Sequence, residues 1–189
     1  GFYSTSLGRI RNGLQLVDEE GVTPSAENPV APHAIYKAYD VDPDAPERQQ
    51  GSFLEARYDH GGYMTSLTVY RGCGECVEET YQCQMPCEHA ERHDFSWDEA
   101  GRLQEHMNLE GAWNEAEGRY EFAEVSARYQ FTYNSSNARV IKKKVAQDPA
   151  ESSYTLYLSD NFEVRGAGMS PEGGFEGGER TKYIHLFDR

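Results

Sequence analysis

Residues 52–70, SFLEARYDHGGYMTSLTVY, decide the fold class of this chain, because they contain two strand-like runs joined by a short glycine-rich turn. Apolar and polar side chains alternate in residues 52–59 and again in 63–70, which is the period of a half-buried strand. His60-Gly61-Gly62 between them supplies residues that tolerate positive φ. The stretch therefore predicts a β-hairpin. One face of its second strand is expected to carry Tyr63, Thr65, Leu67 and Val69.

The same two-residue period recurs along most of the chain after residue 34. Further strands are predicted at residues 35–41, 120–133, 140–145, 154–158, 162–165 and 182–188. Short strands at this spacing, without helices alternating between them, favour an antiparallel sandwich or barrel. The sequence therefore predicts a mainly β protein.

Two segments depart from this period and predict helices. Leu7, Ile10, Leu14 and Val17 recur at steps of three and four residues, which is typical of an amphipathic helix and predicts an N-terminal helical unit over residues 1–21. Ser96 followed by Glu99 forms a capping-box pattern, which predicts an internal helix over 96–107. Residues 22–189 are then expected to form one β-rich domain that carries a cysteine-containing insert at 71–95.

Composition restricts the classes of partner. The chain has 189 residues and a net charge of −14, with 13 Tyr, 8 Phe and 2 Trp to supply buried area. This surplus of carboxylates repels phosphate backbones, so nucleic acid is not expected as a partner. The chain contains no run of about 18 apolar residues, so no transmembrane segment is predicted. The basic run Lys142–Lys144 is predicted to form a solvated edge strand, with side chains on both faces.

All four cysteines fall within CGECVEETYQCQMPCEHAERH, residues 73–93. Two nested disulfides, Cys73 with Cys87 and Cys76 with Cys83, are the preferred pairing of the three that four cysteines allow. A bridge that closes about 15 residues is worth about 3 kcal/mol in the chain-entropy model, enough to order an insert with little apolar content. Disulfides indicate an oxidising compartment, so an extracytoplasmic, secreted or periplasmic location is expected.

A metal centre is the alternative for the same segment. The four cysteines can bind one structural zinc ion as thiolates, and His89 can replace one of them. The spacing of Cys73, Cys76, His89 and His93 is similar to that of two-Cys, two-His zinc fingers. The positions that should form a finger's apolar core hold Thr80 and Pro86, however, and proline breaks the helix that would carry the histidines.

A calcium loop is a further possibility for residues 39–47, YDVDPDAPE. Asp40, Asp42 and Asp44 alternate, a spacing that lets carboxylates converge on one hard cation. An EF-hand is excluded because Ala45 and Gly51 stand where that loop needs glycine and glutamate. An Asp-Pro turn with solvated charges is the competing interpretation. No cofactor is therefore assigned, and zinc and calcium remain the candidate ions.

Catalysis has no positive support in the sequence, which contains no nucleophile motif and no phosphate-binding loop. The glycine-rich residues 166–181 are expected to form a surface loop. We expect an exported, non-catalytic recognition or assembly module that contacts a protein or a glycan through its loops and tyrosine-rich sheet faces. Such a module can also form a homo-oligomer. The alternative is a metal-containing enzyme or small-ligand carrier on a β-barrel, with a structural four-cysteine zinc site.

Overall fold

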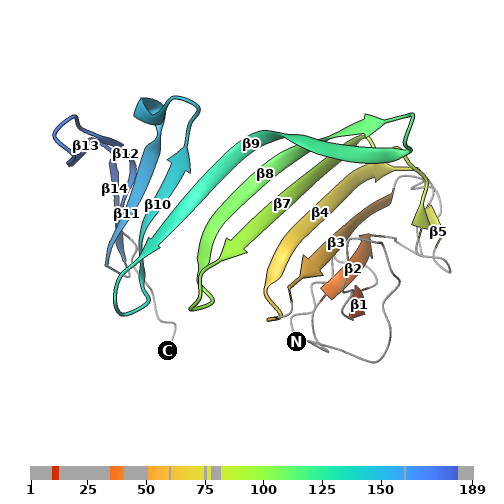
Figure 1. The fold of residues 1–189 in the computed structure, drawn as a ribbon, viewed down its shortest axis with the longest axis horizontal. Helices are drawn as coiled ribbons and strands as arrows, with labels where there is room; N and C mark the ends of the chain where they lie inside the picture. The colour runs from red at the N-terminus through yellow and green to blue at the C-terminus, as the bar shows by residue number, and fades with distance from the viewer. Residues whose placement is uncertain are drawn as a thin grey trace. The chain divides into compact units, whose positions relative to one another are not determined.

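The computed structural model describes residues 10–12, 35–40, 51–59, 61–74, 76–77, 82–159 and 161–182 (Figure 1). For residues 10–12, 35–40, 76–77 and 82 it describes the backbone alone, except that the side chain of Ala38 is also described. The described part is almost entirely antiparallel β-sheet, which confirms the mainly β prediction. Its one helix is the short 3-10 turn Pro149–Glu151, and none of the described helical structure is long or apolar enough to cross a membrane.

The described strands pair mostly with their neighbours in the sequence. Their bounds are β1 Ile10–Asn12, β2 Ile35–Asp40, β3 Gly51–Tyr58, β4 Met64–Cys73, β5 Cys76–Val77, β6 Gln82–Cys83 and β7 His89–Trp97. They continue with β8 Leu103–Asn114, β9 Arg119–Tyr133, β10 Arg139–Val145, β11 Ser153–Ser159, β12 Phe162–Met169, β13 Phe175–Glu176 and β14 Glu179–Lys182. The hydrogen-bonded order is β1-β2-β3-β4-β7-β8-β9-β10-β11-β12, with β13 and β14 both on β12. β5 and β6 form a separate ladder. The choice between sandwich and barrel stays a prediction.

The chain divides into two compact units. Unit 1 comprises residues 1–95 and 108–126, and unit 2 comprises residues 96–107 and 127–189. β7, β8 and β9 each contribute residues to both units.

The predicted hairpin is present as β3 and β4, and it forms the centre of unit 1. Phe53 lies opposite Tyr70, and Ala56 lies opposite Leu67. On one side of β4, Thr68 is buried and Tyr70 packs against the core around Phe53. On the other side of the hairpin, Ala56 lies opposite Leu67 and is also buried. Tyr63 is 41% exposed.

A β-bulge in β4 brings a cysteine onto the core side. Gly51 pairs with Cys73 while Phe53 pairs with Tyr70, so β4 has one residue more than β3 over this stretch. Gly72 within it has a φ of +63°, a backbone conformation that favours glycine. The extra residue shifts the alternation of side chains. Cys73 therefore faces the same core as Phe53 and Tyr70.

The core of unit 1 combines this disulfide with aromatic rings. Phe53, Cys73 and Cys87 are buried, and Tyr70, Cys83 and Tyr120 pack against them. Phe53 stacks on Tyr70 with ring centroids 4.3 Å apart, and Tyr120 lies 5.7 Å from Tyr70. The Tyr120 hydroxyl donates to the carbonyl oxygen of Cys87, and burial raises the pKa of this phenol. The insert is thus tied to the sheet from two sides.

Unit 2 buries much less. Among its described residues, Ser152, Glu163 and Ala167 are the only buried ones. β10 lies between β9 and β11, with Ile141 opposite both Thr132 and Leu156. The prediction that Lys142–Lys144 belong to an edge strand is therefore wrong.

The predicted internal helix is also wrong, because Ser96 and Trp97 end β7 and Leu103 begins β8. Residues 98–102 form a hairpin turn in which Asp98 Oδ1 accepts from the backbone N–H groups of Ala100 and Arg102. Gly101 has a φ of +72° there, which suits a tight turn. Beyond the turn, residues 103–114 have the two-residue period of a strand.

The N-terminal helix is contradicted where it can be compared. Residues 10–12 form β1, which pairs antiparallel with β2 through Ile10 opposite Ala38. The remaining residues of the predicted unit 1–21 lie outside the described part of the chain.

Four hairpins share one five-residue turn, which was not predicted. It occupies residues 59–63, 98–102, 134–138 and 170–174. In each, the backbone N–H of the first residue donates to the carbonyl oxygen of the fifth, and the backbone N–H of the fourth donates to the carbonyl oxygen of the first. The side-chain oxygen of the first residue also accepts from the backbone N–H of the fifth. The fourth residue, Gly62, Gly101, Asn137 or Gly173, has φ between 61° and 84°. The turn is therefore a repeated local solution, based on a short polar first residue.

The glycine-rich segment 166–181 contains more strand than was predicted. β12 continues to Met169, and β13 and β14 follow the turn at 170–174. Most of the segment is exposed, as expected for a surface region. The last predicted strand, 182–188, overlaps β14 only at Lys182, and residues 183–189 lie outside the described part.

Candidate interaction surface

The cysteine segment forms the predicted disulfide between Cys73 and Cys87, with an S–S distance of 2.06 Å. Cys83 is also in disulfide form. Cys76 lies directly opposite it on the β5–β6 ladder, although the side chain of Cys76 lies outside the described residues. The insert between β4 and β7 is thus a short hairpin closed at its base by a bridge. The four-cysteine zinc site stays a prediction about the reduced chain.

His89 and His93 alternate with Glu91 on β7, so the three share one side of the strand. The Nε2 atom of each histidine lies 3.9 Å from the Glu91 carboxylate, which also pairs with Arg71 at 2.7 Å. Within the described residues, no group of His, Cys, Asp or Glu side chains is arranged to hold a metal ion.

The calcium site at Asp40, Asp42 and Asp44 stays a prediction, because its side chains lie outside the described part of the chain. Asp40 is the last residue of β2, where it lies opposite Ser52. Asp42 and Asp44 lie outside the described part of the chain.

A surface of a different kind lies in unit 2. On β9, Tyr129, Phe131 and Tyr133 alternate and so point to one side of the sheet. The register places Lys142 opposite Phe131 and Lys144 opposite Tyr129, on the same side. We call the following set the cation–aromatic face: Tyr129, Phe131, Tyr133, Tyr157, Arg102, Arg139, Lys142 and Lys144.

Each ring of the cation–aromatic face lies beneath a cation. The Arg139 guanidinium carbon is 4.7 Å from the centroid of the Tyr157 ring and 5.5 Å from that of Phe131. The Lys142 Nζ atom is 4.3 Å from the Tyr129 centroid. Contacts of this kind contribute about 0.5–1 kcal/mol each at exposed sites. They also hold long side chains in place over the sheet, so the charges are already positioned.

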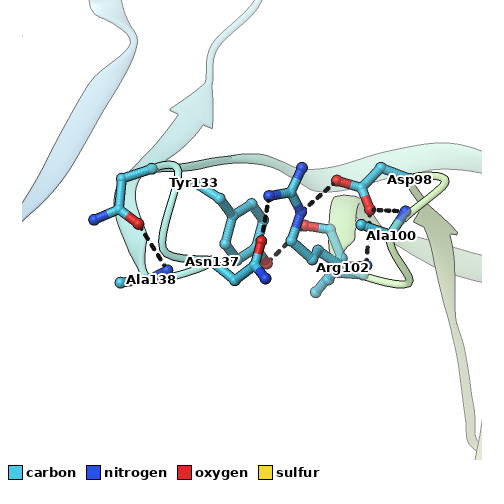
Figure 2. Close-up of polar contacts among 8 residues, drawn as sticks. Asp98, Ala100, Arg102, Tyr133, Asn137 and Ala138 are labelled. Atoms are coloured by element: carbon cyan, nitrogen blue, oxygen red, sulfur yellow. Dashed lines mark hydrogen bonds and ion pairs between the residues drawn. The ribbon is translucent and has the colours of Figure 1, made fainter.

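Arg102 is the most firmly held of the four cations. Its guanidinium lies 5.1 Å from the Tyr133 ring and bridges two turns, donating to Asp98 at 2.7 Å and to Asn137 at 2.9 Å (Figure 2). The Tyr133 hydroxyl donates to the carbonyl oxygen of Leu103. These hydrogen bonds fix one end of the cation–aromatic face. The pKa of the Asp98 carboxyl is held below its usual value, chiefly by the hydrogen bond from the Arg102 backbone N–H and also by the one from its guanidinium.

The charge of the chain is divided unequally between its units. Unit 1 contains 8 Lys and Arg against 21 Asp and Glu, a net charge of −13, whereas unit 2 contains 10 against 11, a net charge of −1. In the described part of the chain, Arg139, Lys142 and Lys144 form no ion pair with a carboxylate. The cation–aromatic face is therefore a local positive region of an acidic protein.

A polar hollow of about 420 Å³ borders this surface at Phe131. Its lining consists of Ser96, Gln104, Glu105, Gln130, Phe131 and Thr132. The Glu105 carboxylate accepts from Arg128 at 2.9 Å and from Gln130 at 3.1 Å, so its lone pairs are partly occupied. Amides and hydroxyls beside a ring can bind a polar ligand, whereas they provide no activated nucleophile.

The cation–aromatic face was missed by reasoning from the sequence. The alternation of Tyr129, Phe131 and Tyr133 was visible, but the position of β10 beside β9 requires knowledge of the register. One signal in the sequence was available. The turn at 134–138, which joins β9 to β10, has a polar first residue and a glycine or asparagine at its fourth position, like the other three turns. Comparison with known proteins adds no relative, because no family model matches the chain and no curated protein is significantly similar to it.

Proposed function

We propose that this chain is an exported, non-catalytic recognition or assembly module that contacts a protein or glycan partner through the cation–aromatic face of unit 2. The observation that supports this most strongly is the placement of a cation over each of four rings in a chain whose net charge is −14. Like charges gathered on one face repel one another, and a bound anion offsets this repulsion. The face therefore favours an anionic partner.

The sheet gives this surface the rigidity that recognition needs. β10 is hydrogen bonded on both sides, to β9 and to β11, so Arg139, Lys142 and Lys144 project from a fixed backbone. Side chains that are already ordered lose less conformational entropy when they bind. The surface can therefore give useful affinity from a small number of contacts.

The location outside the cytoplasm is supported by the disulfide chemistry. The Cys73–Cys87 bridge lies in the core of unit 1, and Cys83 is disulfide-bonded as well. Such bridges persist in oxidising compartments and are rare in the cytosol. Purification from an exported fraction without reductant should give no thiol that reacts under denaturing conditions. Four reactive thiols in that fraction would contradict export with bridged cysteines.

A binding array tests the proposed function. The full chain is applied to immobilised acidic, neutral and basic glycans and to acidic, neutral and basic peptides. The variant Arg139→Gln/Lys142→Gln removes two cations from the face, and its matched control, Arg119→Gln/Lys143→Gln, removes two cations elsewhere. We expect the wild type and the control to retain one acidic class of ligand and the face variant to lose it. Equal binding by all three proteins would contradict a role for this face.

A further inference from the structure

We propose that the occupant of the cation–aromatic face is an acidic polypeptide, specifically the segment around Asp40, Asp42 and Asp44 of a second copy of this chain. This inference rests on the proposed function, since it uses the same surface, and it names the partner. It also gives a role to the alternating aspartates of residues 39–47.

The rings themselves argue against a sugar as the main occupant. A sugar commonly binds by stacking its apolar side on a bare aromatic face. Here Arg102, Arg139 and Lys142 lie over the rings, at 4.3–5.5 Å from their centroids. The groups presented outward are therefore guanidinium and ammonium N–H donors. Those donors fit carboxylates, and arginine forms paired hydrogen bonds with them.

The spacing of these donors fits an extended polypeptide. Lys142 and Lys144 project from the same side of β10, so they are about 7 Å apart along the strand. In an extended chain, carboxylates at alternate positions have the same separation of about 7 Å. A partner with two or three alternating acids can therefore place one carboxylate at each cation.

This chain contains such a sequence in YDVDPDAPE, residues 39–47. In a free peptide, Pro43 and Pro46 disfavour helical backbone at the residues before them, so Asp42 is biased towards an extended conformation. The segment carries four carboxylates and no cation. It belongs to unit 1, the unit with a net charge of −13, so the two halves of the contact differ in charge.

A contact between different surfaces of two identical chains is heterologous. It leaves a free face on one copy and a free acidic segment on the other, so association continues into open chains or closes into a ring. The net charge of −14 on each copy opposes association at long range. The contact is therefore expected to be weak, and salt should weaken the local ion pairs further.

A peptide experiment tests the chemistry directly. The probe is the synthetic peptide YDVDPDAPE, and its control is YVDDDPAPE, which has the same composition but adjacent aspartates. We expect the full chain to bind the first peptide about tenfold more tightly than the second, and the Arg139→Gln/Lys142→Gln variant to lose this preference. Equal affinity for the two peptides would overturn the spacing argument.

A mixing experiment tests the second copy as partner. Light scattering at low salt should give a mass that rises above 21.4 kDa with concentration for the wild type. Two variants should each stay monomeric alone: Asp40→Asn/Asp42→Asn/Asp44→Asn and Arg139→Gln/Lys142→Gln. Their charge-matched controls, Glu115→Gln/Glu117→Gln/Glu124→Gln and Arg119→Gln/Lys143→Gln, should associate like the wild type.

Mixing the two monomeric variants gives the decisive result. One variant keeps an intact face and the other keeps an intact acidic segment, so together they should form a heterodimer that cannot grow. A wild type that remains monomeric at all concentrations, or a mixture that remains monomeric, would overturn the inference. If the array shows instead that a glycan binds the face and the peptide does not, the proposed function stands and the inference about the second copy fails.

Discussion

Unit 1 and unit 2 have the same antiparallel strands but are stabilised in different ways. In unit 1, Phe53, Cys73 and Cys87 are buried, with stacked rings around a disulfide. In unit 2, the buried residues within the described part are small or polar. Its order comes from hairpin turns, from the Arg102 bridge between two of them, and from cations held over rings. Burial of apolar area stabilises the first unit, and polar and cation–aromatic contacts stabilise the second.

The comparison shows what each arrangement permits. Side chains that pack in a core are removed from solvent and cannot meet a partner. The rings of unit 2 are only half-buried, and their cations remain at the surface. A unit that relies on such contacts is less stable per residue, but its charged and aromatic side chains remain accessible to a partner. We therefore expect stability to depend mainly on unit 1 and binding to depend mainly on unit 2.

The largest expected effect is on the core of unit 1. Phe53→Ala removes an 8% exposed ring that stacks on Tyr70, so the free energy of unfolding should fall by about 3 kcal/mol or more. The matched change in unit 2, Phe131→Ala, removes a half-buried ring and should cost about half as much. Chemical denaturation monitored at Trp113 in unit 1 and Trp97 in unit 2 measures both. Equal losses would remove the difference in packing between the units.

Removal of the disulfide should have the next largest effect. Cys73→Ser/Cys87→Ser removes a bridge between cysteines that are 14 positions apart. The chain-entropy model then predicts a loss of about 3 kcal/mol in the free energy of unfolding. The loss should be reported by the fluorescence of Trp113, which packs edge-on against Tyr120 at 5.1 Å. A variant that unfolds at the wild-type denaturant concentration would show that the bridge adds nothing to unit 1.

A smaller effect is expected in the turns of unit 2. Gly101→Ala places a side chain at a φ of +72° and should lower stability by about 1 kcal/mol. Ala100→Gly, in the same turn, is the control, because Ala100 does not need positive φ. Thermal unfolding followed by Trp97 fluorescence compares the two. If Gly101→Ala unfolds at the same temperature as the control, the shared turn is not under this constraint.

The smallest expected effect is a pH dependence at the same turn. Hydrogen bonds from the Arg102 backbone, the Arg102 guanidinium and the Ala100 backbone lower the pKa of Asp98 below its usual 3.8. A pKa that is lower in the folded state contributes stability above pH 3.8, and this contribution is lost as the pH falls through the folded value. Asp98→Asn lacks it.

Denaturation of the wild type and of Asp98→Asn between pH 7 and pH 2 measures this contribution. The wild type should be the more stable protein at pH 7, and the difference should shrink as the pH falls below 3.8. A difference that stays constant over this range would show that the ionised form of Asp98 is not preferred by the folded chain.

The strands were the part of the fold that the sequence predicted well. The alternation of apolar and polar residues in 52–70 and 140–145 predicted strands from local sequence alone, and these strands are present as β3, β4 and β10. The internal helix failed because Ser96 and Glu99 fit a cap as well as they fit the end of a strand. Asp98 and Gly101 decided between the two, since together they form the hairpin turn. Turn chemistry outweighed the capping pattern.

The site was less predictable than the fold. The bridge between Cys73 and Cys87 was predicted because both cysteines lie in one short segment. The cation–aromatic face depends instead on strands that are adjacent in the sheet, with Lys142 opposite Phe131 and Arg139 reaching Tyr157. Lys142 was predicted to lie on an edge strand, whereas β10 has a neighbour on each side, and Arg139 at its start contacts Tyr157 of β11. Pairing between strands decided its environment, and a single sequence does not contain the register.

The most direct test of the division between the units measures binding and stability together in the same variants. For each protein, affinity for the peptide YDVDPDAPE and the denaturation midpoint are determined. We predict that Arg139→Gln/Lys142→Gln loses about tenfold in affinity while it stays folded under the binding conditions, with a midpoint lowered only by its lost ring contacts. Arg119→Gln/Lys143→Gln, which loses the contact of Lys143 with Tyr154, should keep its affinity. A face variant that binds the peptide as well as the wild type, or one that loses binding only because it unfolds, would contradict the account.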